Sequence, residues 1–510
     1  MPSENNKRIA KNTLFLYARM IVVMVISLYT VRVILNALGP TDYGIYNVVG
    51  GIVLMFSFLT SSLVSTSQRF FAYTLGCNDK RKLSQYFMTS IWCHVIIVLI
   101  VLIIGETAGL YFVINKLTIP SNRLVAALWV YQFTIASFII NMIAVPYNSI
   151  LIAHERMNIY AIVGLVEAIV KLGCAYLIVI SPIDKLIMYA FLIMVSSIGL
   201  NLFYIMYCTA KFKECKLMKF WDYQMFKEVI SFSGWSLYGG MAGIIRSQGI
   251  NILINIYFNP IVNAARAIAY QVNSAMNQFV LNFFKAVQPQ ITKYYAASEL
   301  DELFKLIFRS SRFSYYLFFC ISLPIYIASP EILKLWLKEV PQYTVIFTRL
   351  AIVVALVDSM SYPLQTAISA TGKIKWYQMI SGTFTLLNLP ISWIFLYYGF
   401  PPQITMCIAI FLSLLSQISR LIFSKYLFNL SISDYCQKVI KPILIVSFIS
   451  IGLSIITMIL SRTYYISFLL SFCICCLATF FIGMSKKERH IIVKTICIKL
   501  KIPNHFSKND

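Results

Sequence analysis

Runs of apolar residues long enough to cross a membrane recur along almost the whole chain. Short stretches rich in glycine, proline and aspartate, such as 38–42 and 181–184, separate these runs and favour turns. About 20 apolar residues suffice for one transmembrane helix. The pattern predicts an all-α polytopic membrane protein with about 14 transmembrane helices, at 12–37, 44–67, 84–113, 124–152, 159–180, 186–209, 232–258, 262–288, 306–328, 343–370, 376–398, 403–425, 439–461 and 464–484.

Two segment pairs indicate an internal duplication. The segment PYNSILIAHERMNIYAIVG from Pro146 aligns without gaps with PLQTAISATGKIKWYQMIS from Pro363, so the numbering shifts by 217. The segment LGPTDYGIYNV from Leu38 resembles FNPIVNAARAI from Phe258, a nearly equal shift of 220. Six predicted helices separate the copies, so the halves share one orientation, as in the parallel type of transporter repeat.

The duplication predicts the domain organisation. We expect an N-terminal six-helix lobe at 1–209, a basic connector at 210–231 and a second six-helix lobe at 232–425. The two lobes should surround a central polar cavity. Two additional helices at 426–484 and a basic tail at 485–510 lie outside the duplication.

Charge fixes the expected orientation. The chain is 59% hydrophobic and carries a formal net charge of +24, which in a soluble protein would suggest nucleic acid. If the N-terminus is placed in the cytoplasm, 29 of the 43 lysines and arginines fall in cytoplasmic loops and termini. Only six fall in the loops on the other side of the membrane. Loops rich in lysine and arginine stay cytoplasmic. We therefore expect both termini in the cytoplasm and no nucleic-acid partner.

The stretch from Phe232 to Gln290 contains two membrane-length helices that are too polar to face lipid on every side. Polar groups at membrane depth are costly, so they are expected to face a bundle interior or a water-filled cavity. In the second helix they share one helical face. We predict that this face lines the central cavity; its polar residues are Arg266, Tyr270, Asn273, Asn277, Lys285 and Gln288.

Basic residues within the predicted helices are candidates for binding an anion. Arg246 lies about 20 Å along its helix from Phe232, so it should face water or an anion. Arg19 lies about 10 Å inside the membrane, where reaching the interface is strained. The other basic residues, apart from Lys171, lie near helix ends, where long side chains reach the interface; they are Arg32, Arg266, Lys285, Arg349 and Arg420.

Acidic residues within the predicted helices are candidates for coupling transport to a proton or sodium ion. Asp358 shares a helical face with Tyr362 and Gln365, and it could instead be a buried partner of a basic residue. Glu167 precedes Lys171 by four residues, the order that favours a salt bridge on a helix. A structural pair and a transport site both remain open there.

Catalytic patterns and cofactor motifs are absent from the sequence. The four histidines form no metal-spaced pair, and no glycine-rich phosphate loop is present. Cys473, Cys475 and Cys476 lie in an apolar helix without a histidine nearby, so they are expected to be filler rather than metal ligands. We predict a protein that is not an enzyme and needs no cofactor other than a coupling ion.

Several segments resemble the polysaccharide-transporter branch of the multidrug/oligosaccharidyl-lipid/polysaccharide exporter superfamily. They include LYARMIVVMVISLYTVRVILNALGPTDYGIYNVV near the N-terminus, SSLVSTSQRFFAYTLG, the ILIAHERMNIYA turn and FSGWSLYGGMAGIIRSQGINILI. The resemblance covers essentially the whole chain. It implies an O-antigen or capsule flippase of the bacterial inner membrane, which moves undecaprenyl-pyrophosphate-linked oligosaccharide by alternating access.

The resemblance also implies roles for particular residues and partners. Cationic residues of the cavity are expected to meet the pyrophosphate and sugar, a role that passes to Arg19 and Arg246, and then to Lys171 and Lys285. Expected partners are the lipid-linked oligosaccharide, membrane lipids and other polysaccharide assembly proteins. Three alternatives remain: a multidrug cation exporter, a lipid II flippase of the same superfamily, and a membrane polysaccharide polymerase or ligase.

Overall fold

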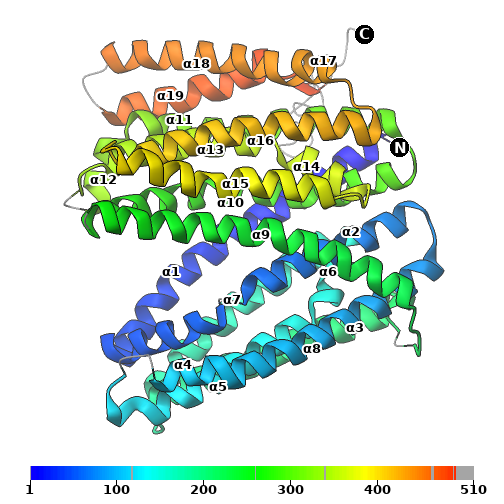
Figure 1. Ribbon diagram of the computed structural model, residues 1–510, viewed down its shortest axis with the longest axis vertical. Coiled ribbons are helices and arrows are strands. Elements are labelled where there is room, and N and C mark those ends of the chain that lie inside the picture. The colour runs from blue at the N-terminus through cyan, green and yellow to red at the C-terminus, as the bar shows by residue number, and fades with distance from the viewer. Residues whose placement is uncertain are drawn as a thin grey trace, which may run out of the picture. The chain divides into compact units, whose positions relative to one another are not determined.

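The computed structural model describes residues 2–54, 56–115, 119–216, 218–258, 260–337, 340–460, 464–485 and 488–489. Most of the predicted basic tail lies outside these residues. The described residues form helices and no strands, which confirms the all-α membrane fold (Figure 1). The helices are α1 (Pro2–Leu54), α2 (Ser57–Gly76), α3 (Lys80–Ile104), α4 (Leu110–Asn115), α5 (Leu124–Ile143), α6 (Val145–Ala153), α7 (Met157–Ile180), α8 (Lys185–Lys211), α9 (Tyr223–Tyr257), α10 (Pro260–Ala296), α11 (Leu300–Ile327), α12 (Ser329–Leu337), α13 (Thr344–Ser359), α14 (Tyr362–Ala370), α15 (Lys375–Tyr397), α16 (Ile404–Phe428), α17 (Ile432–Tyr435), α18 (Lys441–Leu460) and α19 (Tyr464–Ala478).

The number of apolar helices is smaller than the predicted number of spans. Each of the 14 predicted segments overlaps a helix, but only ten helices among the described residues are long and apolar enough to cross a membrane, or eleven if α11 and α12, bent by 79°, form one span. The remaining predictions fall on the end of α1 together with α2, and on α9, α10 and α11. Polar residues lower the hydropathy of α2, α9 and α10, while α11 counts only together with α12.

The chain divides into two compact units. Unit 1 comprises Met1–Ile244, Lys285–Leu303 and Thr366–Thr383, and unit 2 comprises Ile245–Phe284, Phe304–Gln365 and Phe384–Asp510. Two short segments of the second sequence half thus belong to the unit built mainly from the first half. The lobe boundaries predicted from the duplication remain a prediction.

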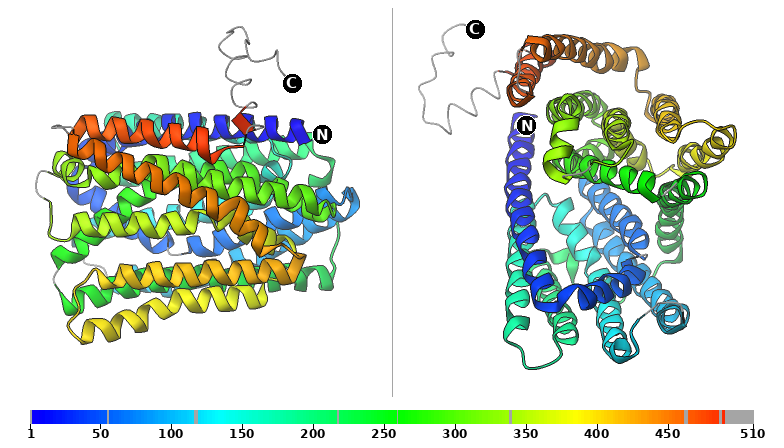
Figure 2. Two further views of the ribbon diagram at one scale, coloured as in Figure 1. Left: turned by 90° about the horizontal axis from the view of Figure 1, so that it is seen from above. Right: turned by 90° about the vertical axis from the view of Figure 1, so that its left-hand side faces the viewer.

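Unit 1 packs its helices along their lengths. Helix α7 contacts both α1 and α8, and α2 packs against α3 and α6 (Figure 1). One of its core clusters is aromatic and aliphatic, with Phe71, Phe87 and Ile150 fully buried. In unit 2, α18 and α19 lie side by side (Figure 2).

Matching helix ends agree with the predicted duplication. The numbering shifts by 218 between the starts of α7 and α15, and by 217 between their ends. It shifts by 220 between the ends of α2 and α10, and by the same amount between the starts of α3 and α11. The turns after α2 and α10 also share a left-handed residue, Asn78 with φ +58° and Ser298 with φ +59°. These two turns therefore fold alike at the level of single hydrogen bonds, because the amides of 77–79 and 297–299 bond the same relative carbonyls.

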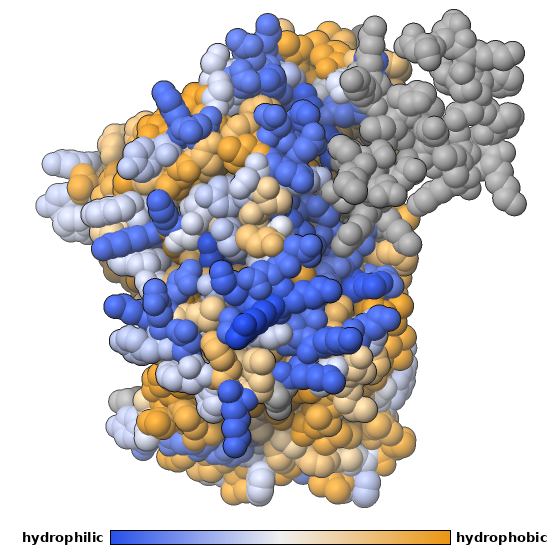
Figure 3. Space-filling view, turned by 90° about the vertical axis from the view of Figure 1, so that its right-hand side faces the viewer, coloured by the Kyte–Doolittle hydropathy of each residue, from blue (hydrophilic) through white to orange (hydrophobic). Residues whose placement is uncertain are grey.

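We call the end of the helices at the α2–α3 turn the inner end. Lys80, Arg81 and Lys82 follow this turn directly. Figure 3 views this end and shows hydrophilic residues gathered on it. The charge pattern makes it the expected cytoplasmic end.

Candidate functional site

Two predicted basic residues meet at one tyrosine in unit 1. The guanidinium carbon of Arg19, on α1, lies 4.5 Å from the ring centre of Tyr160, on α7. The Nζ of Lys285, on α10, lies 4.2 Å from the same ring centre and donates a 2.7 Å hydrogen bond to the tyrosine hydroxyl. A cation over an aromatic face is attracted by the negative face of the ring. We call Arg19, Tyr160 and Lys285 the cationic cluster.

Helix α7 makes room for this cluster with a glycine. A β-carbon on Gly164 would lie 2.1 Å from the Nε of Arg19, far inside any normal contact. The guanidinium therefore rests directly on the α7 backbone. Its Nε is buried and has no hydrogen-bond partner among the described residues.

The cationic cluster carries two positive charges without a carboxylate to balance them. No ion pair to Arg19 or Lys285 occurs among the side chains that the structure describes. Two uncompensated cations in a partly buried site favour an anionic ligand, and the arginine fork fits phosphate oxygens. This arrangement can hold an anion near the α1, α7 and α10 helices.

Unit 2 contains a second arginine-rich site. Arg266 is almost fully buried, and its Nη1 bonds the side-chain oxygen of Asn251 and lies 3.5 Å from the carbonyl of Ser247. Its guanidinium also lies 4.7 Å from the ring centre of Tyr270. Arg246 is close enough for its charge to act on Arg266. The sequence left two interpretations of Arg266 open, the polar face of α10 and the membrane interface; its burial against Asn251 and Tyr270 favours the polar face.

The remaining polar candidates of unit 2 lie along α10 and α13. Asn277 bonds the hydroxyl of Tyr362 at 3.4 Å, and the Oδ1 of Asn273 is buried without a partner among the described residues. Asp358 is half-buried near the end of α13, and its backbone carbonyl accepts hydrogen bonds from Ser361. No ion pair to Asp358 or Arg246 is found among the described side chains.

Lys171 and Glu167 form the local pair that their spacing suggested. The Nζ of Lys171 lies 2.7 Å from the carboxylate of Glu167, and both side chains are more than 40% exposed in the protein. Neither touches the cationic cluster in any contact that the structure describes. The pair leaves the predicted roles in substrate and ion binding as proposals.

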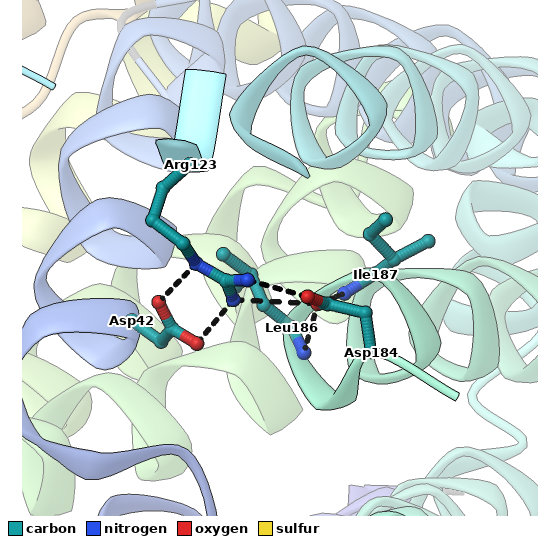
Figure 4. Close-up of polar contacts among 5 residues, drawn as sticks. All are labelled: Asp42, Arg123, Asp184, Leu186 and Ile187. Carbon is teal, nitrogen blue, oxygen red and sulfur yellow. Dashed lines mark hydrogen bonds and ion pairs between the residues drawn. The ribbon is translucent and has the colours of Figure 1, made fainter. Parts of the chain in front are cut away.

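A further charged cluster lies at the opposite end of unit 1 from the α2–α3 turn. Arg123 bonds both Asp42 and Asp184, so one guanidinium joins α1, the α4–α5 connection and the α7–α8 loop (Figure 4). The side chain of Asp184 also accepts hydrogen bonds from the backbone amides of Leu186 and Ile187 at the start of α8. Burial alone would raise the pKa of Asp184, but Arg123 and these amides outweigh it and hold the pKa below its ordinary value.

Metal ligands do not cluster in the part of the chain that the structure describes. No group of three histidine, cysteine, aspartate or glutamate residues there could hold a metal ion. The chemistry offered by the described side chains is therefore charge pairing, cation–aromatic contact and hydrogen bonding.

Comparison with known proteins identifies the family. Residues 9–295, more than half of the chain, match the family described as "Polysaccharide biosynthesis protein". The chain belongs to this family. The match confirms the predicted place in the polysaccharide-transporter branch.

Solved structures agree on the fold. "Crystal structure of MATE in complex with MaD3S" superposes with a TM-score of 0.70 at 14% identity, covering 83% of this chain and 97% of that one. A "multidrug resistance MATE family transporter of the MOP superfamily" in an outward-facing conformation gives a TM-score of 0.69 at 12% identity, covering 83% and 95%. A MOP superfamily transporter from Pyrococcus furiosus gives 0.63 at 12% identity, covering 82% and 95%. No curated protein matches the chain in sequence. The fold is therefore that of these solved membrane transporters.

Sequence reasoning missed three residues that the structure places at buried polar contacts. Tyr160 lies in the duplicated segment from Pro146 but was not among the predicted site residues. Glu155 was not among the predicted site residues; the structure places it in a turn, with φ +59°. Arg69 falls just outside the predicted span 44–67, yet it is a buried residue of α2. The polarity around Arg69 ended the predicted span early, while the helix continues to Gly76.

Proposed function

We propose that this protein is a flippase for undecaprenyl-pyrophosphate-linked oligosaccharide, an O-antigen or capsule repeat unit, in the bacterial inner membrane. It moves its substrate by alternating access, with both termini in the cytoplasm. Membership of the polysaccharide biosynthesis family and a transporter fold support this proposal. The cationic cluster is the observation that carries it.

The cluster suits the charged part of such a substrate. The pyrophosphate is anionic, and its transfer through hydrocarbon without partners would be prohibitive. Arg19 and Lys285 offer an arginine fork and an ammonium group to phosphate oxygens, while Tyr160 holds both cations in place. The same charge argues against a multidrug cation exporter, since like charges repel.

The other predicted residues take supporting roles in the proposal. Arg246, with Arg266 nearby, forms a second phosphate contact, and Asn273 and Asn277 meet sugar hydroxyls. Lys171 contacts the substrate less directly. Asp358 or Glu167 binds the coupling proton or sodium ion, and other polysaccharide assembly proteins receive the product. Asp358→Asn should remove ion dependence without lowering the amount of protein in the membrane; retained ion dependence would leave Asp358 a structural residue.

The glycines of α7 offer a sharp test of the cationic cluster. Gly164→Ala should push the guanidinium of Arg19 aside, because the new β-carbon would collide with it. Gly173→Ala on the same helix is the matched control, since nothing lies within 4 Å of its β-carbon. A charge-assisted contact is worth about 1.5–3 kcal/mol, so we expect roughly ten- to a hundredfold loss of substrate affinity for Gly164→Ala.

The readouts are protein level in the membrane and glycan on the outer leaflet. Arg19→Ala and Lys285→Gln should reduce glycan at normal protein level, whereas Arg32→Ala, on an exposed part of α1, should not. Normal glycan export by Gly164→Ala, Arg19→Ala and Lys285→Gln would remove the cluster from the transport path. Restored peptidoglycan synthesis in a strain lacking its lipid II flippase would instead assign that substrate.

A further inference from the structure

A buried carboxylate lies on the inner side of the cationic cluster. The side chain of Glu155, in the turn between α6 and α7, is fully buried, and its carboxylate accepts hydrogen bonds from Lys293 at 2.6 Å and Gln290 at 2.7 Å. Both donors lie on α10. The carbonyl of Glu155 also accepts a 3.4 Å hydrogen bond from Asn12 on α1. We call the carboxylate with Gln290 and Lys293 the Glu155 contact.

One apolar layer separates this contact from the cationic cluster. It consists of Leu16 from α1, Ile152 and Met157 from either side of the turn, and Ala286 from α10, none of them more than 4% exposed. Along α1, Leu16 falls between Asn12 and Arg19; along α10, Ala286 falls between Lys285 and Gln290. The same three helices thus present, in order, an ionic layer, an apolar layer and the two cations.

A second contact at the inner end joins the same parts of the duplicated chain. Arg69, near the end of α2, donates hydrogen bonds to the carbonyls of Ser369 at 3.2 Å and Ala370 at 3.0 Å, at the end of α14. The guanidinium of Arg69 lies 4.4 Å from the ring centre of Phe70 and is buried. We call this the Arg69 contact. The carbonyl of Ser369 also accepts the backbone amide of Gly372, and the helix dipole favours a cation at this end of α14.

The duplication relates the two contacts. In the Arg69 contact, the inner end of α2 binds the turn after α14, in the second copy. In the Glu155 contact, the inner end of α10 binds the turn after α6, in the first copy. The two turns match in the duplicated alignment, with Glu155 and Gly372 both at positive φ. The two helix ends also touch directly, because a β-carbon on Gly76 would lie 2.7 Å from the β-carbon of Ala296. All of these residues belong to unit 1.

We propose that the Glu155 and Arg69 contacts, with the apolar layer between Glu155 and the cations, form a gate at the inner end of the protein. While both contacts hold, the apolar layer excludes water and headgroups from the cationic cluster on this side. Breaking them lets α10 and the α14–α15 turn move away and exposes Arg19 and Lys285 to the inner end. This inference rests on the proposed function for its direction, since the substrate is loaded from the cytoplasmic side.

A cysteine in the apolar layer tests the gate without any substrate. Ala286→Cys, in a chain whose native cysteines are replaced, changes a buried residue conservatively. A membrane-impermeant sulfonate thiol reagent should label it slowly in inside-out vesicles. Lys293→Gln should raise that rate at least fivefold, and Arg69→Lys should raise it by a smaller factor.

Two further variants guard against simple misfolding. The exchange Glu155→Lys with Lys293→Glu retains the ion pair and should return the labelling rate toward the reference. The cysteine pair Gly76→Cys and Ala296→Cys can form a disulfide once the ends of α2 and α10 move apart by about 1 Å, because a β-carbon at Gly76 would lie 2.7 Å from both the β-carbon of Ala296 and the carbonyl oxygen of Lys293, whereas a disulfide needs its β-carbons about 3.5–4.5 Å apart. Oxidation should then stop labelling of Ala286→Cys from the inner end, and a reductant should restore it.

The outcomes separate the gate from the proposed function. Lys293→Gln and Arg69→Lys proteins that reach the membrane at normal level but label at the reference rate would overturn the gate. Equal labelling of the oxidised and reduced cross-linked proteins would overturn it as well. Altered labelling in these variants together with normal glycan export by Gly164→Ala would leave the gate intact and reject the proposed substrate site.

Discussion

The turn between α6 and α7 and the turn between α14 and α15 are equivalent in the duplication, but they bind their neighbouring helices by different chemistry. Glu155 places a carboxylate at the left-handed position of the first turn, and Lys293 and Gln290 bind that side chain. Gly372 has no side chain at the equivalent position, and Arg69 binds the backbone carbonyls just before it. A duplicated turn has thus kept its backbone while the group that binds it changed from a side chain to the main chain.

This difference has a physical consequence for each copy. A non-glycine residue with positive φ is strained, by on the order of 1–3 kcal/mol, so Glu155 must be held by its partners. Glycine adopts positive φ without that cost. The missing β-carbon also leaves space for Arg69, whose Nη2 would lie 2.7 Å from it. The first turn therefore depends on charge, and the second depends on shape.

The largest expected effect comes from removing the positive charge of Lys293, which binds the first turn from α10. Lys293→Ala leaves the buried Glu155 carboxylate without its ammonium partner, and breaking a buried pair in this way costs about 3–5 kcal/mol. We expect a loss at the low end of this range, because Gln290 still donates to Glu155. Thermal unfolding in detergent measures the loss. Adding Glu155→Gln in the same chain should recover most of it; no recovery would show that Lys293 acts through other contacts.

The second turn should lose stability when a side chain is added at Gly372. Gly372→Val forces a branched side chain into positive φ, at a cost on the order of 1–3 kcal/mol, and also displaces Arg69. Gly399→Val is the matched control, since Gly399 has φ +81° with nothing within 4 Å of its β-carbon. The difference in melting temperature between the two variants isolates the contribution of Arg69. Equal losses would mean that Arg69 is not displaced.

Arginine geometry can be tested separately from charge. Arg69→Lys keeps the positive charge but loses the planar fork that reaches Ser369 and Ala370 together. We expect a loss of about 1.5 kcal/mol, the low end of the range for hydrogen bonds with a charged group. Arg81→Ala, an exposed arginine in the neighbouring helix α3, should change stability by less than about 0.5 kcal/mol. A similar loss in both variants would contradict a special role for Arg69.

The smallest effect concerns pH and the residue beside Glu155. The Nε2 of His154 lies 2.7 Å from Glu214, and this hydrogen bond is the main cause that holds the pKa of Glu214 below its ordinary value. A lowered folded pKa stabilises the protein above the unfolded pKa of about 4.3, and this stabilisation is lost as pH falls through the folded value. Glu214→Gln should therefore cost on the order of 0.5–1 kcal/mol at pH 7. The two proteins should converge in melting temperature below about pH 4; a constant gap down to pH 3 would point to another cause.

The sequence was sufficient for the features that repeat along the chain. Apolar runs predicted the helices, and two short matches predicted the offsets that the helix ends then showed. It was not sufficient where polarity and helix disagree: α9 and α10 are 35 and 37 residues long, although many of their residues are polar. A hydropathy pattern reflects only the polarity of the side chains. A helix forms inside a membrane because the backbone N–H and C=O groups of every residue there must be hydrogen-bonded.

Long-range pairing explains what the sequence could not provide at the site. Arg19 and Lys285 were each predicted to bind substrate, but their common partner Tyr160 lies 125 residues from Lys285. The Glu155 contact joins residues separated by 138 positions, and the Arg69 contact joins residues separated by 301. No local spacing encodes such contacts, because they arise only after distant helices pack.

The cluster of Arg123 with Asp42 and Asp184 also bears on how the chain is synthesised. Its first carboxylate, Asp42, precedes Arg123 by 81 residues and is already synthesised when the arginine emerges. Its second, Asp184, follows 61 residues later, immediately before α8. We expect the nascent chain to hold Arg123 with only one carboxylate partner until α8 begins to insert. We therefore expect the cluster to be complete only after the sixth predicted span has begun to be synthesised.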